Sequence, residues 1–180
     1  MSYTSIYRLW PDENRVEEAV ELRNSHGSAP IVWGSIMEKY LGVDRFSMGN
    51  YDRLWPLWKD ERLTPEQRAI LLLTYDNAML AKAHYRKCAD DIDAFMRQLP
   101  TPSEYANHWP AIAEFLRGDP DCPFVGFRWT SVCCNPFQGA FNDEKDDYDA
   151  PDWSKYWSVY DEFNQSMTTP VDPLPGECDG

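Results

Sequence analysis

The stretch that decides the fold is Thr64–Leu99, TPEQRAILLLTYDNAMLAKAHYRKCADDIDAFMRQL. It opens with a helix start signal, because Thr64 is placed to accept from the amide of Gln67 while the Gln67 side chain reaches back. Pro65 stands at the first helical position, where a proline costs no hydrogen bond. No glycine and no further proline follow before residue 99. The pattern predicts one long helix over residues 65–98.

The apolar residues of this stretch step by threes and fours, which gives the predicted helix one packing face. They are Leu71, Tyr75, Ala78, Ala81, Tyr85, Cys88, Ile92, Phe95 and Leu99. Unbroken, the helix would be about 51 Å long at a rise of 1.5 Å per residue. A compact domain of this size has a diameter of roughly 40 Å. The helix must therefore bend, break or protrude, and its stripe packs either on the same chain or on a second copy.

Shorter elements are expected on both sides of the long helix. Residues 3–10 predict a strand, and residues 124–132 predict a second strand that can pair with it. Helical spacing is found at residues 13–24, 28–42 and 109–117. Pro151 begins a further predicted helix, with aromatic rings along one side at Trp153, Tyr156, Trp157, Tyr160 and Phe163.

Together these elements predict a mainly α fold of the α+β class, built around one long central helix with a small β element. A chain of 180 residues has room for one globular domain, which we place at residues 1–166. Residues 167–180 are rich in proline and poor in apolar side chains, and we expect a disordered acidic tail.

The charge of the chain excludes several classes of protein. Asp and Glu number 30 against 17 Lys and Arg, a net charge of -13. This balance disfavours direct binding to nucleic acid or to an anionic membrane, since both need a basic surface. No apolar run approaches the ~20 residues of a membrane span. Five cysteines, an odd number, fit reduced thiols, so a cytoplasmic setting is expected, the host cytoplasm if the protein is phage-encoded.

Most of the excess negative charge lies near the carboxyl end. From Asp143 onward there are eleven acidic residues and two lysines, a net of -9. Clustered carboxylates can take the place of nucleic-acid phosphates on a basic protein, and aromatic side chains beside them can supply desolvated anchors. The expected partner-binding residues are Asp143, Glu144, Asp146, Asp147, Tyr148, Asp149, Asp152, Trp153 and Trp157. The alternative interpretation is a solvated loop before a core helix.

Evidence for catalysis is weak, and the leading interpretation is a non-enzymatic protein without metal or cofactor. The chain contains neither a phosphate-binding glycine loop nor an HExxH motif. One alternative is a small enzyme or zinc protein centred on Cys122, Cys133, Cys134 and His108, although these thiols lack CxxC spacing. Another is a structural protein that forms homodimers through the 65–98 helix.

Two segments, LWPLWKDERLTPEQRAILLLTYDNAMLAKAHYRKCADDIDAFM at residues 54–96 and NHWPAIAEFL at residues 107–116, resemble short proteins encoded by bacteriophages and prophages. The resemblance covers about the middle third of the chain and carries no active residues. It implies a setting in which small acidic proteins inhibit host machinery, including anti-CRISPR and anti-restriction proteins that mimic DNA. The expected partner is then a basic surface of a host or defence protein.

Overall fold

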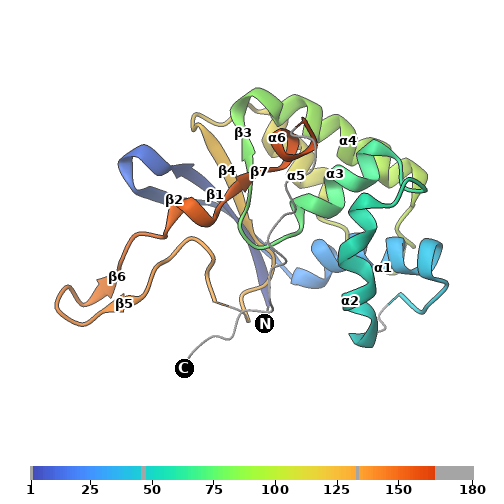
Figure 1. The fold of residues 1–180 in the computed structure, drawn as a ribbon, viewed down its shortest axis with the longest axis horizontal. Coiled ribbons are helices and arrows are strands. Elements are labelled where there is room, and N and C mark those ends of the chain that lie inside the picture. Colours follow the sequence, from blue (N-terminus) through green and yellow to red (C-terminus); the bar gives the residue numbers. More distant parts are fainter. Residues whose placement is uncertain (1, 46–47, 133, 165–180) are drawn as a thin grey trace.

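A sheet of five strands forms the centre of the computed structural model, which describes residues 2–45, 48–132 and 134–164 (Figure 1). The strand order is β2-β1-β4-β3-β7, and a separate two-stranded ribbon is formed by β5 and β6. Neighbouring strands of the large sheet are antiparallel except β3 and β7, which are parallel. The strands are β1 Tyr3–Trp10, β2 Arg15–Arg23, β3 Ala78–Ala81, β4 Phe124–Arg128, β5 Phe141–Asn142, β6 Asp147–Tyr148 and β7 Trp157–Ser158.

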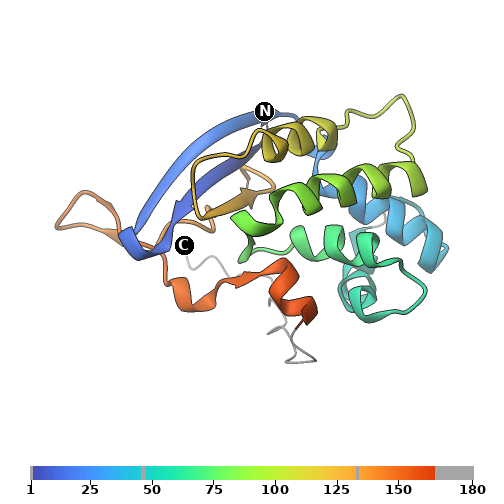
Figure 2. The ribbon, with the colours of Figure 1, turned by 90° about the horizontal axis from the view of Figure 1, so that it is seen from above.

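The larger helices gather at one end of the molecule, and the β5–β6 ribbon projects from the other (Figure 1). Figure 2 shows α4 lying between α3 and α5, and these neighbours are in contact. The α-helices of the described residues are α1 Ala29–Ile36, α2 Tyr51–Leu54, α3 Pro65–Leu73, α4 Tyr85–Gln98, α5 Trp109–Arg117 and α6 Val159–Asn164.

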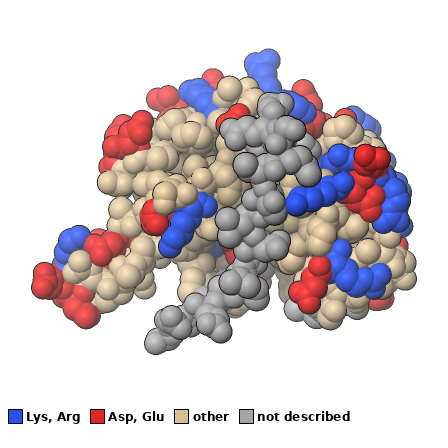
Figure 3. All heavy atoms as spheres, viewed as in Figure 1, with Lys and Arg blue, Asp and Glu red and all other residues tan. Residues whose placement is uncertain are grey.

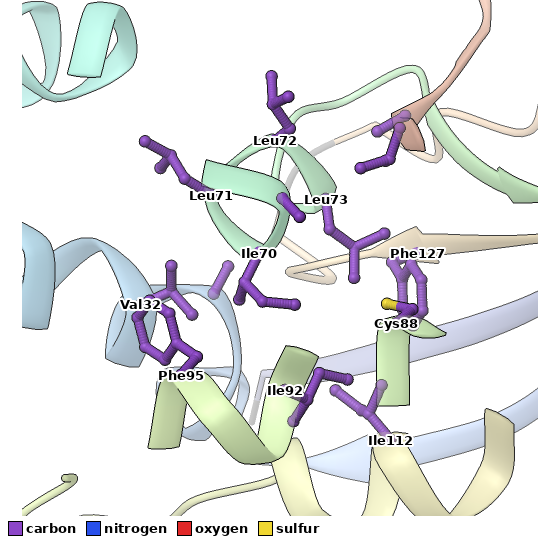
Figure 4. Close-up of a cluster of buried hydrophobic side chains, with 14 of the residues drawn as sticks. Val32, Ile70, Leu71, Leu72, Leu73, Cys88, Ile92, Phe95, Ile112 and Phe127 are labelled. Carbon is purple, nitrogen blue, oxygen red and sulfur yellow. The ribbon is translucent and has the colours of Figure 1, made fainter. Parts of the chain in front are cut away.

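Apolar side chains of the helices and of the sheet meet in one main core (Figure 4). Ile70 of α3, Ile92 of α4 and Ile112 of α5 are fully buried there, and Phe127 of β4 closes the core from the sheet. Each such side chain contributes ~1.5–3 kcal/mol relative to exposure. The core therefore joins the helical layer to one face of the sheet.

Several predicted elements are confirmed. Residues 3–10 form β1, which pairs antiparallel with β4 from Ser5↔Arg128 to Leu9↔Phe124. The helix over residues 109–117 is α5. The capping box at the start of α3 is complete, since the Gln67 amide donates to Thr64 Oγ1 and the Thr64 amide donates to Gln67 Oε1.

The prediction of a mainly α fold around one long central helix is wrong. Residues 65–98 form α3, then the strand β3 at Ala78–Ala81, then α4. With β3 in its interior, the five-stranded mixed sheet is a principal part of the architecture and not a small β element. The class is α+β, with several short helices packed beside a five-stranded mixed sheet.

Tertiary contacts explain the break in the predicted helix. At the end of α3 the Thr74 hydroxyl donates to Leu71 O at 2.7 Å and accepts from Trp33 Nε1 at 2.8 Å. Beyond this turn, Met79 and Leu80 pair with Gly126 and Val125 of β4, and both apolar side chains are buried. Burial on the sheet outweighs the local helical preference of these residues.

The predicted helix at residues 13–24 is also wrong, because Arg15–Arg23 is the edge strand β2. The register passes from Ile6↔Val20 to Tyr7↔Glu18, which leaves Ala19 as the extra residue of a bulge. A bulge shifts the side-chain alternation by one position. Val16 and Val20, which are four residues apart and would share a face in a regular strand, therefore lie on opposite faces of the sheet, across from Leu9 and Ile6.

Residues 151–163 do not form the predicted single helix. A 3-10 turn at Trp153–Lys155 is followed by β7 and by α6. The amide of Trp157 donates to Asn77 O, so the segment adds a strand beside β3 where the sequence pattern indicated a helical face. The predicted tail at residues 167–180 lies outside the described residues.

Candidate functional site

The predicted acidic segment forms a projecting hairpin, residues 139–150, which we call the acidic arm (Figure 1). Its stem is closed by two backbone hydrogen bonds, from Gly139 N to Asp149 O and from Asp149 N to Ala140 O, both 2.9 Å. Further out, Phe141 pairs with Tyr148 and Asn142 with Asp147. The chain reverses at the four residues between the strands, so the acidic side chains cluster at the tip.

Local hydrogen bonds explain why the chain turns at this point. Asn142 Oδ1 accepts from the amides of Glu144 and Lys145 at 3.0 and 3.3 Å, an arrangement typical of turns begun by asparagine. Asp146 has a φ of 52°, a left-handed conformation that aspartate tolerates better than most residues. The tip is thus shaped by its own sequence.

Four carboxylates of the arm are exposed and form no ion pair with any described residue. They belong to Asp143, Glu144, Asp146 and Asp147. Figure 3 shows acidic side chains gathered at this end of the molecule. Unpaired carboxylates this close together give a locally negative field that extends into solvent.

The other two predicted carboxylates have partners within the chain. Lys145 Nζ lies 2.6 Å from Asp149 Oδ1, and this bond together with Asn142 lowers the pKa of Asp149. The Ser154 hydroxyl and amide donate to Asp152, which lowers the pKa of Asp152, and Lys155 lies 3.7 Å away. Asp152 caps the 3-10 turn and stands outside the arm.

Two aromatic rings stand beside these four carboxylates, and the amide of one ring residue, Tyr148, donates to Asp147 Oδ1 at 2.8 Å. Phe141 and Tyr148 lie opposite each other on the two strands, with ring centroids 5.3 Å apart at an interplanar angle of 78°. Their side chains are 51% and 49% exposed. Tyr148 was among the predicted residues, whereas Phe141 was missed because it precedes the acidic run. Its only sequence signal is a position next to the turn-forming Asn142.

The two predicted tryptophans belong to the body of the molecule. Trp153 Nε1 donates to Asn14 Oδ1 at 2.9 Å, beside the β1–β2 turn. Trp157 lies in β7, and its ring is 6.0 Å from that of Tyr75. Both side chains are half-buried and make internal contacts. The structure therefore brings together residues 143–149 and separates them from Trp153 and Trp157.

The residues of the zinc alternative make other contacts. Cys122 is buried with Sγ 3.3 Å from the Tyr85 hydroxyl, and burial raises the pKa of the Cys122 thiol. His108 Nε2 lies 2.9 Å from Asn24 O, and Cys134 is exposed. Cys133 lies outside the described residues. Within the described part of the chain, no group of three His, Cys, Asp or Glu side chains is placed to hold a metal ion.

The surface needed by the homodimer alternative is used inside the chain. Of the nine residues in the predicted stripe, all but Ala81 are buried. Cys88, Ile92 and Phe95 of α4 belong to the main core and contact other elements of the same chain. The helix that was to pair with a second copy is neither continuous nor exposed along this stripe.

The fold and the arm define an α+β protein with a mixed sheet and a projecting acidic hairpin. In comparisons with known proteins, no family model, no curated protein and no solved structure matches the chain. Across residues 2–45, 48–132 and 134–164, none of the helices has both the length and the apolar character needed to cross a membrane.

Proposed function

We propose that this is a non-enzymatic cytoplasmic protein that docks its acidic arm on a basic surface of a partner protein. The observation that carries the proposal is the set of four exposed carboxylates at the tip of the arm that form no ion pair with a described residue, those of Asp143, Glu144, Asp146 and Asp147. Carboxylates that are not neutralised within their own chain remain available to arginines and lysines of another protein.

Charge and aromatic groups have separate roles in this proposal. The carboxylates speed the encounter and align the partners, because electrostatic attraction acts over a Debye length of roughly 8 Å at physiological salt. Phe141 and Tyr148 supply the contacts that exclude water, since aromatic side chains dominate the energetics of interfaces. The two rings replace Trp153 and Trp157 as the proposed anchors.

The partner surface is one that normally binds nucleic acid, so the arm acts as a mimic of DNA. Such surfaces are basic and recognise phosphates largely by charge. The resemblance to phage proteins that we expect for residues 54–96 and 107–116 is our reason for proposing a partner in a host defence system, of the kind blocked by anti-CRISPR or anti-restriction proteins.

The test begins with identification of the partner by co-purification from the natural host. The dissociation constant is then measured over a salt series for the wild type and for D143N/E144Q/D146N/D147N. Four exposed pairs of ~0.5 kcal/mol each correspond to ~30-fold weaker binding. The wild type should lose affinity steeply with salt, and the variant should show a shallower dependence. Nucleic acid should compete with the wild-type protein for the partner.

A matched control removes the same charge elsewhere. Asp12, Asp52, Glu61 and Glu104 are exposed, lie outside the arm and form no ion pair with any described residue. The variant D12N/D52N/E61Q/E104Q should bind nearly as well as the wild type. An equal loss of affinity in the two variants would mean that the net charge of the protein, and not the arm, determines binding. Unchanged binding by the arm variant would contradict the proposal outright.

A further inference from the structure

The base of the acidic arm is attached to the face of the sheet opposite the main core. Side chains alternate along a strand, so Ile6, which lies in the main core, faces away from Tyr7 and Leu9. Tyr7 and Leu9 form a second apolar cluster with Met79 and Phe137. Phe137 precedes the arm by two residues and is 2% exposed, so the arm begins at a buried anchor.

Phe137 occupies a space that only glycine leaves open. A Cβ atom added to Gly126, at the centre of β4, would lie 2.7 Å from Phe137 Cε1 and 2.8 Å from Leu9 Cδ1. Gly126 pairs with Tyr7 on one side and Met79 on the other, and both of these residues belong to the second cluster. The ring of Phe137 thus lies directly over the backbone of the central strand.

The two ends of the arm are also tied to each other. The ring of Tyr156 stacks on that of Phe137, with centroids 5.7 Å apart and an interplanar angle of 29°. The Tyr156 hydroxyl donates to Pro136 O, and Asn135 Nδ2 donates to the Tyr7 hydroxyl at 3.2 Å. The segments before and after the arm therefore meet at the stacked rings of Phe137 and Tyr156, and Trp153 packs beside Tyr156 on the same cluster.

The arm itself has little that could fix its direction. Its strands are two residues long each, and a hairpin of this size is marginally stable in water. Its side chains are exposed or half-exposed, so burial within the arm contributes little. A fixed orientation must come from the base.

We infer that Phe137, seated over Gly126 and stacked on Tyr156, is the positioning residue that holds the acidic arm in a fixed orientation on the sheet. The inference rests on the proposed function in one respect: a fixed arm presents its four carboxylates and two rings to the partner in an orientation that is set before binding. An ordered arm loses less conformational entropy on binding than a loose one. Loosening the base should weaken binding by about tenfold without removing any charge.

The closing experiment measures backbone order by 15N relaxation in the full-length protein. In the wild type, amides of residues 139–150 should have order parameters near those of the sheet, about 0.85. Phe137→Ala should lower them below about 0.6 while the amides of β1 and β4 keep their values. Met79→Ala is the control, because it removes a buried side chain of the same cluster that does not belong to the arm. It should leave the arm ordered.

Two outcomes overturn the inference: unchanged order in the arm of Phe137→Ala, or equal loosening by Met79→Ala. Should Phe137→Ala fail to fold, Tyr156→Phe removes only the hydroxyl that bridges to Pro136 and should loosen the arm to a smaller degree. An unchanged arm in that variant would then count against the inference.

A titration separates this inference from the proposed function. Deca-arginine added to the 15N-labelled wild type should shift the amides of residues 143–149 at low salt, and about tenfold more peptide should be needed for Phe137→Ala. If the wild type shows no shifts, the docking function fails while the relaxation data still decide the role of Phe137. If it shows shifts and both proteins have equally ordered arms, docking stands and the positioning role fails.

Discussion

Because Gly126 has no side chain, the ring of Phe137 can pack directly on strand β4. We expect Gly126→Ala to destabilise the protein by about 1–3 kcal/mol, because the new methyl group displaces Phe137 and Leu9. Urea unfolding monitored by tryptophan fluorescence measures the loss. Gly49→Ala is the control, since no described atom lies within 4 Å of an added Cβ there, and its effect should stay within about 0.5 kcal/mol. Equal stability of the two variants would contradict the role assigned to Gly126.

Asp60 shows how one arginine changes the titration of an exposed carboxyl. Side-chain and backbone hydrogen bonds from Arg62 lower the pKa of Asp60 to about 2. The folded chain favours the ionised form, so the contribution of Asp60 to stability is present above its unfolded pKa and is lost as the pH falls toward about 2.

We expect Arg62→Gln to raise the pKa of Asp60 toward the ordinary value of about 3.9. The increase stays partial because the amide of residue 62 still donates to Asp60. Carbon-detected NMR titration of the Asp60 carboxyl between about pH 1.5 and 6 checks the change. A midpoint that does not move in the variant would show that the guanidinium is not the cause.

Among the elements, α6 depends on a polar contact with α4. The Tyr160 hydroxyl donates to Asp91 Oδ2 at 2.6 Å, Lys87 Nζ lies 2.7 Å from the same oxygen, and Tyr160 is only 4% exposed. Burial raises the pKa of Tyr160 well above its ordinary value, so the hydroxyl keeps its proton and remains a donor even in alkaline solution.

Tyr160→Phe should cost about 1.5–3 kcal/mol, the contribution of a hydrogen bond to a charged group. Hydrogen exchange should become faster in α6 before it changes in the main core. Tyr148→Phe, on the exposed arm, removes a hydroxyl of the same kind and should leave stability unchanged. If α6 exchanges at wild-type rates in Tyr160→Phe, another contact holds this helix.

Elements with a local signal could be predicted from the sequence. The capping residues Thr64 and Gln67 marked the start of α3. The missed elements depend on partners far along the chain. Residues 78–81 join the sheet through β4, more than forty positions later, and no glycine or proline marks the break before them. In β2 the bulge residue Ala19 interrupts the alternation that identifies a strand, so the segment was predicted as a helix.

The position of the exposed acidic cluster could be predicted from charge density, whereas the packing around this candidate site could not. Asp143, Glu144, Asp146 and Asp147 stood out by their density in the sequence, and the structure leaves them exposed and without an ion pair to any described residue. Trp153 donates a hydrogen bond to Asn14, which lies in a turn far away in the sequence. The local pattern around Trp153 gives no sign of this contact.

For the whole molecule, the acidic arm should make almost no contribution to stability. D143N/E144Q/D146N/D147N changes the net charge from -13 to -9 and removes no ion pair with a described residue. Its free energy of unfolding should therefore lie within about 0.5 kcal/mol of the wild-type value. Asp91→Asn is the contrast, because it alters one buried carboxylate that accepts from Tyr160 and Lys87. A large loss in the arm variant would show that these carboxylates serve the fold.

The strand order β2-β1-β4-β3-β7 has a consequence for biosynthesis. As the chain leaves the ribosome, only β1 and β2 can pair early, since they are joined by a short turn. The inner edge of β1 stays unpaired until β4 has been synthesised, about 115 residues later. The outer edge of β3 stays unpaired until residues 157–158 emerge. During that interval an open hydrogen-bonding edge is available to chaperones or to other nascent chains, and translation speed becomes part of what determines the yield of native protein.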